Sequence, residues 1–246
     1  MLNIIRADLY RIFRSKGFYI TTALLLLAIA LQNAASSPDI TAVIARLYMV
    51  QFLPYFVLPF ILFVSAADFS SKAIRNVLSN GTPRIKYYLS KLILSCAFCI
   101  FVLLLNLFSA VIIEIARNGF SSGINILLTE SVMRLFFAEM FICISATCVG
   151  VFFVFCTKKT SRAIGAYIAL FMLPYFLLNT IMAVFFDREH SLAYLYNFDF
   201  SYNLATLAQI DSWSSAHIIK VFSIGAFYLL ASTIGGMLIF KRSEIK

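Results

Sequence analysis

The chain has 246 residues, of which 62% are hydrophobic and only 13% are charged. A soluble globular domain has about 45–50% apolar and about 25% charged residues, so this composition excludes an ordinary soluble fold. Basic residues outnumber acidic ones, 20 to 11, which gives a formal net charge of +9. They flank apolar runs and would meet lipid headgroups or a protein partner first, so the charge does not indicate a nucleic-acid partner.

The first 16 residues have the pattern of an interfacial amphipathic helix. One face carries the apolar residues, and Asn3, Arg11 and Arg14 lie opposite. We expect this helix to lie along the inner leaflet and to bend near 15–17 into the membrane, like an elbow. A simple positively charged anchor is the alternative. The residues that form the apolar face are Leu2, Ile5, Leu9, Ile12 and Phe13.

Six apolar runs are long enough to cross a membrane, since a helix needs about 20 residues to span about 30 Å of hydrocarbon. The first run is too long for a signal peptide and lacks a cleavage site followed by a soluble domain, so we expect it to be retained. The prediction is an all-α membrane protein forming a single transmembrane domain over 1–246. The six predicted spans cover residues 17–35, 47–67, 92–113, 135–157, 163–186 and 221–240.

The distribution of charge predicts the orientation of these spans. If the N-terminus is cytoplasmic, 15 of the 20 Lys and Arg residues fall on the cytoplasmic side. The positive-inside rule therefore favours a multi-pass protein with both chain ends in the cytoplasm. In this arrangement residues 68–91 form the longest cytoplasmic loop, and residues 187–219 form a long extracellular loop.

The cytoplasmic loop 68–91 carries start and stop signals for helices. Ile74, Val77 and Leu78 share one face of a short helix that Asn80 and Gly81 would end, because both residues tolerate a left-handed backbone. Thr82 and Pro83 are placed as cap and first residue of the next helix. These signals favour a defined docking element over a plain solvated connector.

Two stretches resemble the permease subunits of type-2 ABC transporters, in particular the short bacterial half-size permeases that include lantibiotic and bacitracin immunity components. They are LYRIFRSKGFYI, at 9–20, and ADFSSKAIRNVLSNGTPRIKYYLSKLI, at 67–93. In that family an R-N-x-L-x-x-G run follows the second span, and Arg75, Asn76, Leu78 and Gly81 match it here. Lys72 departs from the family pattern, which has a small residue or glycine at this position.

The resemblance implies that 70–80 is a coupling helix that contacts a separate ABC ATPase subunit. The residues placed in this contact are Ser71, Lys72, Arg75, Asn76, Leu78, Asn80 and Gly81. It also implies a second permease copy or a related permease, a bacterial cytoplasmic membrane, and export of a peptide such as a lantibiotic, a drug or a lipid-like substrate. No Gly-Lys pair occurs in the sequence, so ATP would be bound by the partner; we expect no cofactor in this chain and no enzymatic activity of its own.

Other polar residues leave alternatives open. Glu139 lies in the fourth run and is a candidate for a polar path; otherwise it reaches the interface or pairs with Arg134. His190 and His217 lack a metal-binding spacing. An intramembrane enzyme would depend on Glu139 and His190, and a motor-free channel or assembly protein is the main alternative function. Five cysteines are expected to be free and apolar in character, namely Cys96, Cys99, Cys143, Cys148 and Cys156.

Overall fold

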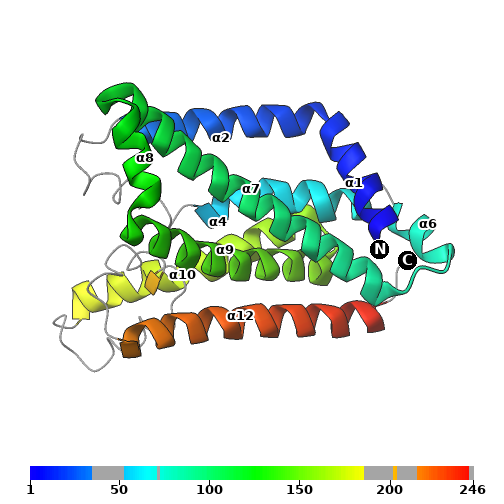
Figure 1. The fold of residues 1–246 in the computed structure, drawn as a ribbon. Coiled ribbons are helices and arrows are strands. Elements are labelled where there is room, and N and C mark those ends of the chain that lie inside the picture. Colours follow the sequence, from blue (N-terminus) through cyan, green and yellow to red (C-terminus); the bar gives the residue numbers. More distant parts are fainter. Residues whose placement is uncertain (35–52, 71–72, 186–201, 204–214, 244–246) are drawn as a thin grey trace.

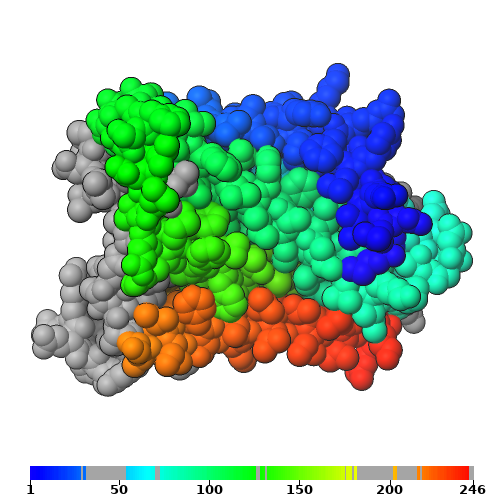
Figure 2. All heavy atoms as spheres, in the orientation of Figure 1, coloured from blue at the N-terminus to red at the C-terminus, as the bar shows by residue number. Residues whose placement is uncertain are grey.

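The computed structural model describes residues 1–34, 53–70, 73–185, 202–203 and 215–243, and in these ranges the chain is almost entirely helical, without a strand. The longer helices run roughly side by side (Figure 1). This confirms the all-α fold class. In the space-filling view, α12 forms one long edge of the molecule and α2 the opposite edge (Figure 2).

The N-terminal helix α1 (Leu2–Arg14) ends at Ser15, which is extended, and α2 (Lys16–Ala34) begins at the next residue. The predicted break in this region is therefore present. The apolar face of α1 packs partly against the protein, because Ile12 is buried and Ile5 and Leu9 contact the core. Part of this face is thus covered by protein, and the position of α1 along the inner leaflet remains a prediction.

The second predicted span is broken in the structure. Its described part consists of α4 (Leu53–Ile61), a π-helical turn η2 (Leu62–Ala66) and the short α5 (Ala67–Ser70). The following helix α6 (Ala73–Ser79) is bent by 66° from this segment. The segment thus contains a π-turn shortly after Pro59, followed by a sharp bend. Residues 47–52 lie outside the described residues.

The third predicted span is the middle of a longer helix. α7 (Arg84–Asn118) extends beyond 92–113 at both ends and stops at Gly119, whose φ of 91° suits glycine. It is followed by α8 (Phe120–Leu128), an apolar helix that packs back on α7 through Gly123 and Ile115. The sequence analysis did not anticipate α8.

The remaining helices agree with the predicted runs and extend them. They are α9 (Glu130–Thr157), α10 (Thr160–Phe185) and α12 (Ser215–Arg242). Lys158 has a φ of 53° and makes the tight turn from α9 to α10. Most of the predicted extracellular loop lies outside the described residues, and its last part, 215–219, is the first turn of α12.

Helix α9 is central, with contacts to α4, α7, α10 and α12. Small residues allow α12 to pack closely on its neighbours: Gly225 lies against Phe141 of α9, and Gly236 lies against Tyr88 of α7. The outward faces of α2, α10 and α12 carry large exposed apolar side chains, including Leu24, Phe176 and Phe227. Such faces are suited to hydrocarbon.

Among the residues that the structure describes, four helices can cross a membrane by length and composition: α7, α9, α10 and α12. The count rises to five if the bent α4–α6 segment is one span, and Lys16–Ala28 forms a shorter apolar helix. Several apolar helices of this kind characterise a multi-pass membrane protein. Six spans and a cytoplasmic N-terminus remain predictions.

One end of the bundle carries most of the basic side chains. Both chain ends and α6 lie there (Figure 1), and Arg84 at the start of α7 donates to the carbonyls of Lys241 and Ser243, at 3.1 and 2.5 Å. At the opposite end, the described basic residues are Arg117, Arg134 and Lys220. We call the end of the bundle that holds α6 the basic end. Its described basic residues are Arg6, Arg11, Arg14, Lys16, Arg75, Arg84, Lys86, Lys91, Lys158, Lys159, Arg162, Lys241 and Arg242.

Candidate functional site

Helix α6 has one face that packs on the bundle and an opposite face that is exposed. Ile74 is buried, and Val77 and Leu78 pack against the core, so the predicted apolar face is confirmed. Arg75 and Asn76, in contrast, are exposed. The inward face fixes α6 on the bundle, and the outward face is accessible to a partner.

The end of α6 is built as predicted. Asn80 and Gly81 form an exposed turn, and the φ of 81° at Gly81 is a left-handed conformation that favours glycine. The next helix begins later than predicted. Pro83 has an extended ψ of 134° and precedes α7, so Thr82 is not its cap. Ser71 and Lys72, two predicted contact residues, lie outside the described residues.

Three helices meet at a buried group of charged side chains, which we call the ionic cluster. Its residues are Asp8 and Arg11 from α1, Asp68 from α5, and Tyr87 and Lys91 from α7. Lys91 is fully buried, and its Nζ lies 2.6 Å from Oδ2 of Asp8 and 2.5 Å from Oδ2 of Asp68. A single ammonium group therefore joins the N-terminal helix to the end of the broken span.

Arg11 and Tyr87 complete the cluster. The Arg11 guanidinium pairs with Asp68 and also contacts Asp8, at 3.2 Å, and the Tyr87 hydroxyl donates to Asp68. A second Arg11 nitrogen lies 3.4 Å from the carbonyl oxygen of Phe63 in the π-turn. With two carboxylates and two cations, the cluster has no net charge, which is the condition under which buried charges are tolerated.

Burial and the neighbouring cation act in opposite directions on Asp8. Removal from water raises the pKa of its carboxyl above the ordinary value, and the nearby Lys91 lowers it. Lys91 is thus the main group that opposes the effect of burial on this carboxyl.

Sequence reasoning missed the ionic cluster. It counted Arg11 and Lys91 only as topology signals, and it placed Arg11 on the polar side of α1. The available signal was Asp8, an acidic residue one turn before Ile12 and close to the apolar face of the amphipathic helix. A charged side chain in that position indicates that it packs against other side chains of the protein rather than against lipid.

Glu139 is buried inside the helix bundle. It lies nine residues, or about 14 Å, after the start of α9 at Glu130. It is 1% exposed and its Oε1 has no hydrogen-bond partner. Arg134 pairs with Glu130, at 2.5 Å, rather than with Glu139.

The remaining candidates do not form a reactive group. All five cysteines are free, with Cys99, Cys143 and Cys148 buried. His217 lies in α12, whereas His190 is outside the described residues. Within the described ranges, no three His, Cys, Asp or Glu side chains are grouped so that they could hold a metal ion.

Comparison with known proteins does not assign a family: no protein-family model and no curated protein matches this chain. The resemblance to ABC permeases therefore remains a prediction from the sequence motifs.

Proposed function

We propose that this chain is the transmembrane permease subunit of an ATP-driven exporter of the type-2 ABC class. It acts as a homodimer or with a related permease in a bacterial cytoplasmic membrane, with both chain ends in the cytoplasm. A separate ATPase subunit binds the ATP, and the cargo is a peptide such as a lantibiotic, a drug or a lipid-like molecule.

The observation that carries this proposal is the construction of α6. Arg75 and Asn76, which match the family motif, are exposed on a short helix that is bent sharply away from the apolar segment before it. An isolated helix of seven residues is not stable in water, so its packing through Ile74 is what maintains it. A packed helix with an exposed polar face is suited to docking.

The ionic cluster supplies a path for movement from α6 into the bundle. A displacement of α6 acts on α5, where Asp68 is bound to Arg11, Tyr87 and Lys91. Through these bonds α1 and α7 move with α5. The π-turn η2 lies directly between α5 and α4, and π-helical turns are often found at functional sites because they are less regular than α-helix.

Photo-crosslinking tests this proposal. The chain is co-expressed with any ABC ATPase that is encoded beside its gene, and a benzophenone amino acid replaces Asn76. The matched control places the same group at Asn125, which is exposed at the opposite end. We expect a crosslink to the ATPase from position 76 and none from 125. No crosslink from position 76 in a complex that still co-purifies would refute the docking role of α6.

A motor-free channel or assembly protein is the alternative function. The cells that co-express the chain and the ATPase can distinguish this alternative from a permease. An exporter loses function when the partner's ATP site is inactivated. Activity that persists in ATP-depleted vesicles, with no ATPase co-purifying, would favour the alternative.

A further inference from the structure

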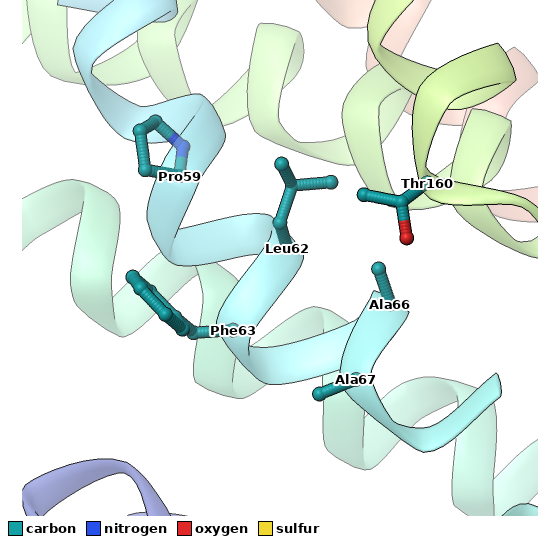
Figure 3. Close-up of a pocket in the computed structure, with 6 residues that line it drawn as sticks. All are labelled: Pro59, Leu62, Phe63, Ala66, Ala67 and Thr160. Atoms are coloured by element: carbon teal, nitrogen blue, oxygen red, sulfur yellow. The ribbon is translucent and has the colours of Figure 1, made fainter. Parts of the chain in front are cut away.

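A shallow apolar groove lies between the broken span and the start of α10. Leu62 and Ala66 point from η2 toward Thr160 (Figure 3). The groove has a volume of about 280 Å³, which is near the lower limit for small-molecule pockets, so it accommodates a slender apolar group rather than a drug-sized ligand. Its lining residues are Pro59, Leu62, Phe63, Ala66, Ala67 and Thr160.

The groove lies at the level where the apolar helices meet the basic end. On one wall, η2 ends two residues before Asp68 of the ionic cluster. On the other wall, Thr160 follows the tight turn at Lys158 that ends α9. The groove is therefore apolar inside and is placed near the headgroup region of the leaflet on the basic side.

Two exposed lysines are sequence neighbours of residues that line the groove or contact its lining. Lys159 directly precedes Thr160. Lys16 directly precedes Gly17, which lies against the Phe63 ring so closely that a Cβ there would stand 3.2 Å from Cε1. Phe63 and Leu62 diverge from η2 toward different sides (Figure 3). Lys159 is thus linked to the groove through Thr160, and Lys16 is linked to it through the contact of Gly17 with Phe63.

We propose that this groove binds an anionic phospholipid, with an acyl chain along Leu62 and Ala66 and the phosphate between Lys16 and Lys159. Basic residues at the cytoplasmic margin of an apolar helix gap are the chemistry that recognises acidic headgroups. Their long aliphatic stems allow both ammonium groups to reach the headgroup level. The site does not depend on the ATPase or on the proposed transport function.

The charge of the basic end favours lipid over a second copy of the chain. Any symmetric contact across this groove would bring Lys16 and Lys159 of the two copies near one another, together with Arg162. Like charges opposed in this way are unfavourable. An anionic lipid, in contrast, neutralises them.

The test uses the full chain, purified, stripped of lipid and titrated with phosphatidylglycerol or with phosphatidylcholine of the same acyl chains. Native mass spectrometry counts the bound lipids. We expect the wild type to retain phosphatidylglycerol preferentially, and the double variant Lys16→Gln/Lys159→Gln to lose about tenfold in apparent affinity. The matched control is Lys241→Gln/Arg242→Gln, an exposed basic pair at the same end on α12, which should bind like the wild type.

A second pair of variants tests the groove itself. Ala67→Phe fills it, whereas Ala169→Phe adds the same ring on an outward-facing position of α10. We expect only Ala67→Phe to reduce binding, and a diazirine-labelled phosphatidylglycerol to modify the peptide that contains 62–67. Equal retention of both lipids, or an equal loss in the Lys241→Gln/Arg242→Gln control, would overturn the proposal. A change of oligomeric state in Ala67→Phe without a change in bound lipid would assign the groove to a second copy instead.

Discussion

Lys91 shows at the scale of one residue how a charged side chain can be retained inside an apolar bundle. Two carboxylates, Asp8 and Asp68, lie within 2.6 Å of its Nζ, and the Tyr87 ring lies 5.2 Å away. Burying ions is costly, so such a group is stable only while each charge has its partner. The cluster is therefore sensitive to the loss of any one member.

We expect Lys91→Met to destabilise the protein by about 3–5 kcal/mol, because it leaves two buried carboxylates with only Arg11 as counter-ion. A fluorogenic maleimide measures unfolding in detergent, since Cys99, Cys143 and Cys148 are buried and react only when the bundle opens. Lys86→Met is the control, because Lys86 is an exposed lysine on the same helix. A melting temperature unchanged in Lys91→Met would contradict the structural importance of the cluster.

Gly236 is a second position where one added carbon atom would change the stability of the protein. A Cβ there would stand 2.1 Å from the Tyr88 hydroxyl, which donates to the carbonyl of Ser232 at 3.3 Å. We expect Gly236→Ala to cost about 1–3 kcal/mol through overpacking. Gly165→Ala, with open space around the new methyl group, should be neutral or slightly stabilising, since alanine is the better helix former. The same maleimide assay compares the two, and equal melting temperatures would disprove the tight α7–α12 contact.

At the scale of elements, the end of α12 depends on α7. Helices leave their last carbonyls without internal partners, and Arg84 donates to two of the carbonyls there, those of Phe240 and Lys241, and to that of Ser243. Side-chain donors of this kind act as C-terminal caps. The contact also joins the first residue of α7 to the last turn of α12.

Arg84→Gln should therefore loosen the last turn of α12. Hydrogen–deuterium exchange of the peptide that covers 236–243 should become faster, while the centre of α12 remains protected. Lys86→Gln serves as the control, because Lys86 is exposed and close to Arg84 on the same helix. If both variants exchange equally, the cap has no role in holding this end.

Elements with strong local signals were predictable, and long-range partners were not. Gly81 and the apolar face of α6 were predicted because backbone conformation and helical spacing are local properties. The helix α8 was missed because its stability comes from packing on α7. The ionic cluster was missed because Asp8 and Lys91 are 83 residues apart, and no local pattern relates them.

At the scale of the whole molecule, the two ends of the bundle differ in charge. The basic end holds both chain termini, α6 and the turn between α9 and α10, and the opposite end has α8 and the start of α9. If the positive-inside rule decides the orientation, the basic end faces the cytoplasm. The proposed ATPase contact and the proposed lipid site both require this orientation.

Labelling in intact cells tests the orientation. A membrane-impermeant maleimide should modify Asn125→Cys from outside, whereas Asn80→Cys should react only after the cells are opened; both positions are exposed, and they lie at opposite ends. The wild type is the background, since three of its five cysteines are buried and the other two partly so. Labelling of Asn80→Cys from outside would place α6 on the wrong side for any cytoplasmic ATPase. In that case the charge distribution would reflect binding to an external anionic partner, and the motor-free alternative would become the better account of the protein.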